Sequence, residues 1–174
     1  SSGRLRATTS AAEALSDADV ALICVGTPSN ANGSLSTEYL ERVAEDVGAN
    51  LPEGRRLVVT VRSTMLPGTC ERVVIPAIER AAGSPMGERF AVCVNPEFLR
   101  EGTSVKDFYD PPKTVVGQSD DEAGAPVASL YDGLPGPVFR VPIGVAEMAK
   151  YVDNSFHALK VGFANEIGAI CKAS

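Results

Sequence analysis

The sequence predicts an α/β protein in which a doubly wound parallel sheet is followed by one long helix. Five short runs of apolar and β-branched residues alternate with segments of helical periodicity, as in strands joined by crossover helices. From 145 to 173 the chain contains no proline and keeps a helical apolar spacing. Together these patterns favour an open sheet with helices on both faces.

The five predicted strands are rich in valine and other apolar residues. The first three are almost entirely apolar, which is typical of strands covered by helices on both faces of a parallel sheet. They are Val20–Val25, Leu57–Val61, Phe90–Val94, Thr114–Gly117 and Val138–Val141.

Two helices are predicted between these strands. The first covers the apolar positions from Leu40 to Leu51, with Ser36 as its expected N-cap. The second covers Gly68–Ala81, and we expect Pro76 to kink it.

The last predicted helix, from 145 to 173, would be about 43 Å long at 1.5 Å per residue. Such a helix links two domains or packs against a second chain, because a small domain has no wall of that length. We expect it to project from the sheet and to form a homodimer. Its apolar side consists of Met148, Val152, Phe156, Leu159, Phe163, Ile167 and Ile170.

The composition excludes several classes of protein. The formal net charge of −6 argues against a nucleic-acid partner. The longest apolar run is far shorter than the roughly 20 residues needed to span a membrane, and the first residues lack the order of a secretion signal. We therefore expect a cytoplasmic protein without a membrane partner.

The four cysteines are widely spaced, and the chain has one histidine. This pattern predicts neither a metal site nor a disulfide framework. Cys24 and Cys93 lie in apolar runs, so we expect both to be buried and reduced.

Candidate binding residues follow the first two strands, where ligands bind in open α/β sheets. In Val25-Gly26-Thr27 the glycine lets a ligand approach the backbone and the threonine can hydrogen-bond it, although a simple turn is the alternative. Ser63 and Thr64 precede a helix N-terminus, a setting that favours polar or anionic ligands; helix capping by either residue is the alternative.

The segment after the third strand carries two carboxylates. Glu97 and Glu101 are four residues apart, with Arg100 between them. On a helical turn the two glutamates would share a face, where one could serve as a general base. A solvated acidic loop is the alternative.

Polar residues also share one side of the long helix. At about 100° per residue, Lys150, Asn154, His157 and Asn165 fall within an arc of roughly 80°. A cation, two amides and an imidazole suit an oxygen-rich ligand such as a sugar phosphate or a nucleotide. A solvated polar face is the alternative.

Four segments together resemble the nucleotide-sugar 6-dehydrogenases over nearly the whole chain. The helix segment with His157 is more similar to the GDP-mannose branch than to the UDP-glucose branch. The segments are VGTPS at 25–29, VRSTMLPG at 61–68, NPEFLREGT at 95–103 and AEMAKYVDNSFHALKVGFANEIG at 146–168.

The resemblance implies an enzyme of polysaccharide biosynthesis that oxidises a sugar C6 alcohol to a carboxylate in two NAD-dependent steps. The intermediates would be an aldehyde, a cysteine thiohemiacetal and a thioester that water cleaves. It also implies that residues 1–141 form the second half of a Rossmann-like NAD-binding domain. Residues 142–174 would then be the central helix leading to a substrate domain.

The resemblance further implies roles for individual residues. Glu97 or Glu101 would be the base for thioester hydrolysis, while Lys150 and Asn154 would stabilise oxyanions and hold the hydrolytic water. The implied cofactor-binding residues are Val25, Gly26, Thr27, Ser63, Thr64 and Glu101. The implied substrate-binding residues are Phe98, Leu99, Arg100, Glu101, Lys150, Asn154, His157 and Asn165.

Two features of the family are absent from the 174 residues: a G-x-G-x-x-G turn for the NAD pyrophosphate and a GGSC-type loop carrying the nucleophilic cysteine. We therefore expect an internal piece of the enzyme, inactive by itself. Three alternatives remain: a UDP-glucose 6-dehydrogenase, a non-enzymatic dimerisation module and a 3-hydroxyacid-type dehydrogenase. The two glutamates argue against the last, because a single oxidation forms no thioester.

Overall fold

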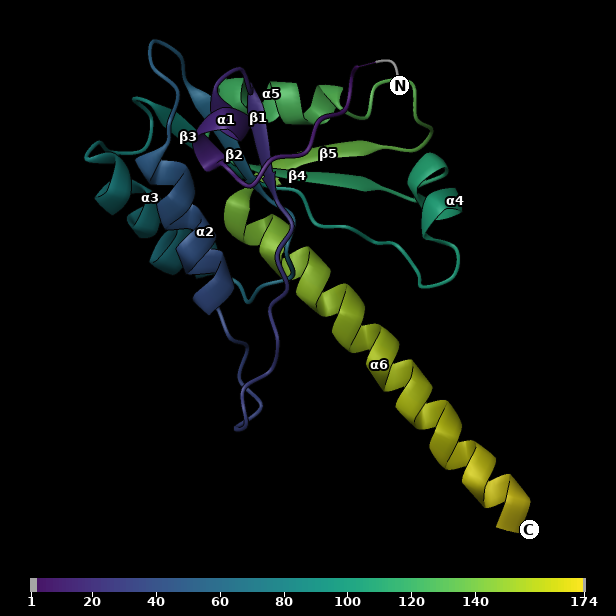
Figure 1. The fold of residues 1–174 in the computed structure, drawn as a ribbon. Coiled ribbons are helices and arrows are strands. Elements are labelled where there is room, and N and C mark those ends of the chain that lie inside the picture. The colour runs from purple at the N-terminus through teal and green to yellow at the C-terminus, as the bar shows by residue number, and fades with distance from the viewer. Residues whose placement is uncertain (1–2, 174) are drawn as a thin grey trace.

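The computed structural model describes residues 3–173 and contains a five-stranded sheet with helices on both faces (Figure 1). All five predicted strands are present, although the first ends two residues earlier than expected. In spatial order, which is also chain order, they are β1 (Val20–Ile23), β2 (Leu57–Val61), β3 (Phe90–Val94), β4 (Thr114–Gln118) and β5 (Val138–Pro142).

The sheet is mixed, which corrects the expectation of a wholly parallel one. β3 and β4 pair antiparallel, through Cys93 with Gln118 and Val94 with Gly117, while all other neighbours are parallel. A parallel connection requires a crossover, usually a helix packed on the sheet. Here the connection carries only the short helix α4 (Ser104–Tyr109), and β4 starts beyond the carboxyl end of β3.

Helices cover both faces, so the doubly wound arrangement is confirmed (Figure 1). Leu57 and Val59 lie in the core on the side of α2, α3 and the start of α6, whereas Val58 and Cys93 pack with α5 on the other side. The helix bounds are α2 Glu38–Ala49, α3 Ile75–Ala82, α5 Asp121–Ser129 and α6 Ile143–Ala173.

Two expected helix details differ in the structure. The N-cap of α2 is Thr37 rather than Ser36, and its side chain makes no capping bond. The second predicted helix consists of a π-helical turn, η1 (Cys70–Val74), followed by α3, with Pro76 in the first turn of α3. Because η1 runs directly into α3, Pro76, which has no N–H, lies where the helical hydrogen-bond pattern changes from π to α.

Three short helices were not predicted: α1 (Ala11–Leu15), α4 and α5. A signal for α5 was present, because the N-cap Asp120 accepts a 2.8 Å hydrogen bond from the Ala123 N–H. Hydrogen bonding to the Arg56 guanidinium, at 2.6 Å, lowers the pKa of Asp120. This ion pair ties the start of α5 to the residue before β2.

β1 has one open face, which corrects the prediction that Cys24 is buried. Leu22 is 47% exposed and Cys24 is exposed, while α5 packs against β2, β3 and β4. Cys93 is buried as expected, and burial raises the pKa of its thiol to about 12.

The long helix α6 has 31 residues and projects from the sheet, as predicted (Figure 1). Its buried residues are Ile143, Ala146, Glu147 and Lys150, and from Tyr151 to Ala173 all are exposed except the half-buried Gly168. Within residues 3–173 no helix combines the length and apolar character required to cross a membrane.

Gly117 in β4 allows α6 to lie directly on the sheet. A Cβ built at this glycine would stand 2.6 Å from the Ala146 Cβ and 3.1 Å from the Ile143 Cα. Gly144, on the same helix, has open space around it.

We predict that Gly117→Ala destabilises the fold by about 1–3 kcal/mol, because the added methyl group must push α6 away from β4. Urea unfolding would measure this change. Gly144→Ala is the matched control and should leave the midpoint unchanged or slightly higher, because alanine is favoured over glycine in a helix. Equal midpoints for the two variants would contradict the close packing.

The loop between β3 and α4 is held by Asp107, a buried carboxylate. Arg100 donates to it from the guanidinium Nη2 at 2.7 Å and from the backbone N–H at 2.9 Å, and the Thr103 hydroxyl donates at 3.0 Å. These bonds, led by the Arg100 side chain, hold the pKa of Asp107 well below its usual range.

The lowered pKa of Asp107 predicts how stability depends on pH. Its contribution is complete above the ordinary carboxyl pKa of about 4 and declines as the pH falls below it, because the unfolded chain then takes up the proton first. Urea midpoints of the parent and of Asp107→Asn should therefore differ most near pH 6 and converge toward pH 2. The exposed Asp132→Asn should match the parent at both pH values.

Candidate functional site

The loops that follow β1 and β2 are joined by hydrogen bonds from their hydroxyl groups. The Ser63 Oγ donates to the Val25 carbonyl at 2.6 Å, and the Thr27 Oγ1 donates to the Thr64 carbonyl at 2.8 Å. Four of the predicted cofactor-binding residues therefore use side-chain or backbone polar groups to hold the two loops together. The sheet edge is thus shaped before any ligand binds.

Two predicted cofactor-binding residues remain open to a ligand. A Cβ built at Gly26 would meet nothing within 4 Å, so its backbone can be approached closely. The Thr64 side chain is half-buried, and its hydroxyl makes no hydrogen bond to any residue in the described part of the chain. At this edge a ligand could therefore contact the exposed backbone of Gly26 and hydrogen-bond to the Thr64 hydroxyl.

The helix N-terminus after β2 is filled by an internal carboxylate, which corrects the expectation of an anionic ligand there. Glu147 of α6 accepts hydrogen bonds from the N–H groups of Gly68, at 2.5 Å, and Cys70, at 2.8 Å. Neither Ser63 nor Thr64 caps this helix. Sequence reasoning missed Glu147, although it lies one turn before Lys150 on the predicted helix.

Cys70 lies beside this carboxylate and is fully buried. Burial, reinforced by the negative charge of Glu147, raises the pKa of its thiol far above the ordinary value. Cys70 therefore remains a protonated, unreactive side chain, as a packing cysteine does.

The segment after β3 is not helical, so the expected shared face of Glu97 and Glu101 is wrong. Glu97 instead folds back locally, with its Oε2 accepting from the Leu99 N–H at 2.7 Å, and its Oε1 accepts from the Lys150 Nζ at 3.1 Å. Glu101 is exposed and begins a turn in which Gly102 has a φ of 82°. The two carboxylates consequently have different surroundings.

Lys150 is buried beside an aromatic ring. Its side chain is 8% exposed, and its Nζ lies 5.4 Å from the centre of the Phe98 ring. Lys113, which sequence reasoning missed, lies 4.3 Å from the same ring and donates to Asp153 of α6 at 3.1 Å. The ring thus interacts with two ammonium groups, one from α6 and one from the residue before β4.

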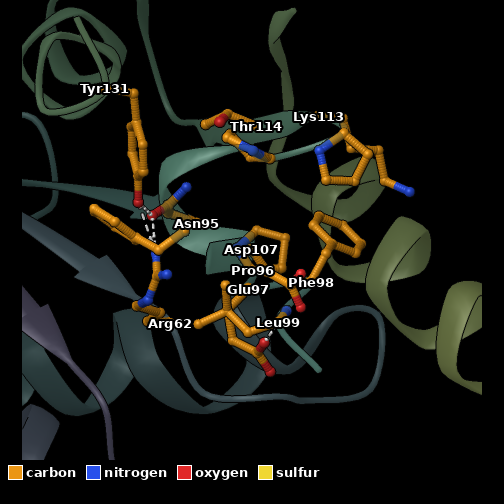
Figure 2. Close-up of a pocket in the computed structure, with 13 residues that line it drawn as sticks. Arg62, Asn95, Pro96, Glu97, Phe98, Leu99, Asp107, Lys113, Thr114 and Tyr131 are labelled. Atoms are coloured by element: carbon orange, nitrogen blue, oxygen red, sulfur yellow. Dashed lines mark hydrogen bonds between the residues drawn. The ribbon is translucent and has the colours of Figure 1, made fainter. Parts of the chain in front are cut away.

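A small cavity, partly open to solvent, lies between this segment and the start of β4 (Figure 2). On one side, the Arg62 Nη1 donates to the Asn95 Oδ1 at 2.6 Å and to the Tyr131 hydroxyl at 2.7 Å. The Asn95 amide also donates to the Val115 carbonyl at 2.9 Å. Phe98 and Lys113 line the other side. The hydrogen bonds among Arg62, Asn95 and Tyr131 therefore hold the polar wall of the cavity in place.

The polar residues of α6 lie partly where the helix packs against the sheet and partly where it projects into solvent. Lys150 contacts Glu97, whereas Asn154, His157 and Asn165 lie in the exposed part of the helix. The structure therefore joins one of these four residues to the loops of the sheet. The binding roles of all four residues stay predictions.

Known proteins of one family are similar to this chain in both sequence and fold. Residues 1–134 match the sequence model of the UDP-glucose/GDP-mannose dehydrogenase family, NAD binding domain, and residues 144–174 match its central domain. The crystal structure of a ternary complex of GDP-mannose dehydrogenase from Pseudomonas aeruginosa aligns with a TM-score of 0.91 and 49% identity. The alignment covers 95% of this chain and 38% of that one.

Sequence relatives agree with the structural match. The GDP-mannose 6-dehydrogenase of Pseudomonas putida is 53% identical over 98% of this chain, and the UDP-glucose 6-dehydrogenase of Haloferax volcanii is 40% identical over 97%. The chain spans about two fifths of the length of these curated relatives, 39% and 40% respectively. By its sequence and its fold, the chain belongs to the UDP-glucose/GDP-mannose dehydrogenase family.

Proposed function

We propose that the complete gene product is an NAD-dependent nucleotide-sugar 6-dehydrogenase that oxidises GDP-mannose to GDP-mannuronate in two hydride transfers. The observation that carries the proposal is the buried Lys150 ammonium, 3.1 Å from Glu97 at the carboxyl end of the sheet. A fixed cation at this edge suits a reaction in which negative charge develops on a sugar oxygen.

The residues after β1 and β2 fit the nicotinamide cofactor. Gly26 leaves its backbone open to close approach, and the Thr64 hydroxyl is available as a hydrogen-bonding group. Thr27 and Ser63 shape the same edge by donating hydrogen bonds to the Thr64 and Val25 carbonyls, respectively. NAD bound there supplies the hydride acceptor.

On the substrate side, Lys150 orients the C6 oxygen and stabilises its negative charge. Asn154, one turn further along α6, adds an amide donor to the same oxygen. We assign the hydrolytic base to Glu97, because Glu97 contacts Lys150 whereas Glu101 is exposed. Glu101 then lies between the cofactor and the sugar, and Phe98, Leu99 and Arg100 border the sugar.

His157 and Asn165 extend the same side of α6, so we place the nucleotide portion along them. GDP-mannose is favoured over UDP-glucose because identity to the Pseudomonas putida GDP-mannose 6-dehydrogenase is 53%, against 40% for the Haloferax volcanii UDP-glucose 6-dehydrogenase. The uronate product would supply cytoplasmic polysaccharide biosynthesis.

The proposal is tested by mixing the complete gene product with NAD and either GDP-mannose or UDP-glucose. We expect two NADH per GDP-mannose and a much lower kcat/KM with UDP-glucose. A preference for UDP-glucose would move the assignment to the other branch. Absence of NADH with both sugars would favour a non-enzymatic module.

We predict that Lys150→Ala lowers kcat at least about 100-fold, because the fixed positive charge beside the reacting oxygen is lost. Steady-state NADH formation measures the effect. Lys172→Ala, on an exposed part of the same helix, is the matched control and should retain parental kcat. Similar kcat values for both variants would remove Lys150 from the reaction.

We also propose that two chains associate through α6. Beyond Lys150 its large apolar residues remain exposed, including Phe156 at 58% and Phe163 at 68%. An exposed apolar stripe of this length is typical of a helix that packs against another chain. A second copy fits, because it presents the same stripe about a two-fold axis.

We predict that Phe163→Asp shifts the complete gene product from dimer to monomer, because two carboxylates would be buried at the centre of the contact. Light scattering after size-exclusion chromatography measures the mass. Lys172→Asp introduces the same side chain outside the apolar stripe and should leave a dimer. A dimer for both variants would place the contact elsewhere.

A further inference from the structure

We propose that Glu147 is a positioning residue that sets where Lys150 lies relative to the loop carrying Thr64. The proposal rests on the proposed function for its kinetic consequence. Its structural part, a carboxylate that joins α6 to the loop after β2, can be tested without that function.

Each carboxylate oxygen of Glu147 has its own backbone partner. Oε2 accepts from the Gly68 N–H at 2.5 Å, and Oε1 accepts from the Cys70 N–H at 2.8 Å. The residue is 1% exposed, and it forms no ion pair with any Lys or Arg in the described part of the chain. Its charge is therefore stabilised by these two N–H groups and by the positive end of the helix they begin.

Helix N-termini are commonly capped by the side chain of the local N-cap residue. Here the capping carboxylate comes from a different helix. Thr69 is the N-cap residue, yet its hydroxyl donates to the Leu66 carbonyl instead. The N–H groups depend on Glu147, which lies 79 and 77 residues away in sequence. A buried charge is costly unless both oxygens stay hydrogen-bonded, so the carboxylate cannot shift without the loop shifting with it.

The loop and the helix carry groups assigned to opposite sides of the reaction. In the loop, the Thr64 carbonyl is held by Thr27, and Gly68 follows four residues later. On the helix, Lys150 lies three residues after Glu147, on the same buried face, and its ammonium reaches Glu97. Glu147 is thus the polar link between the cofactor side and the substrate side.

This link predicts a specific kinetic defect. A displacement of about 1 Å between reacting groups can lower the rate about 100-fold while binding contacts persist. Glu147→Gln has the same size, but its amide group would point a donor at one of the two N–H donors. We expect a decrease in kcat of about 10- to 100-fold, with KM for GDP-mannose within about threefold of the parent.

The experiment compares four variants of the complete gene product by steady-state kinetics, thermal unfolding and amide hydrogen exchange. Glu147→Gln tests the proposal, and Glu147→Asp keeps the charge on a shorter side chain. Glu166→Gln makes the same chemical change at an exposed position of α6. Ile78→Val lowers stability from within the buried core, away from the Glu147 hydrogen bonds.

We expect Glu147→Gln to lose kcat and to exchange faster at Gly68 and Cys70, with Glu147→Asp intermediate in both measurements. Glu166→Gln should match the parent. Ile78→Val should retain kcat at a temperature where it is folded. If kcat follows the unfolding temperature equally in Ile78→Val and the Glu147 variants, the role is structural and the positioning proposal is wrong.

Hydrogen exchange separates this proposal from the proposed function. If the parent forms no NADH from either sugar but Glu147→Gln accelerates exchange at Gly68 and Cys70, the enzymatic assignment fails and the link between helix and loop stands. If exchange at these amides is unchanged, the link itself is refuted, whatever the parent's activity.

Discussion

Two charged side chains on the first turns of α6, Glu147 and Lys150, must be satisfied inside the protein. Burying a charge is unfavourable unless it is paired or hydrogen-bonded, so the surroundings of both groups are tightly constrained. Glu147 accepts hydrogen bonds from the backbone of the loop after β2, and Lys150 donates a hydrogen bond to Glu97 in the loop after β3. The same contacts therefore place the helix and shape the two loops.

The rest of the site is arranged around this attachment. Gly117 provides room for α6 on β4, and Lys113, just before β4, reaches α6 through Asp153. Antiparallel β4 thus contributes to the edge at which β1, β2 and β3 end. The Arg62 and Asn95 network fixes the cavity wall on the far side of Phe98. Both sides of the cavity are held by polar contacts between segments distant in sequence.

Much of the fold was predictable because strands and helices leave local patterns. The apolar runs located all five strands, and the proline-free segment located the long projecting helix. The direction of β4 was not predictable, because the connection from 95 to 113 is long enough for a parallel crossover and also permits an antiparallel return. The exposure of Cys24 was missed for a related reason: an apolar run does not reveal that one face of β1 is open.

By itself the sequence determined the α/β class, the strands, the long helix and the family, since periodicity and contiguous motifs are local properties. Only the tertiary structure decided which charged groups meet. Glu97 pairs with Lys150 rather than sharing a helical face with Glu101, and Glu147 occupies the helix N-terminus that a ligand was expected to use. These contacts join residues 53 to 79 positions apart, and their formation depends on how the loops and α6 pack in three dimensions.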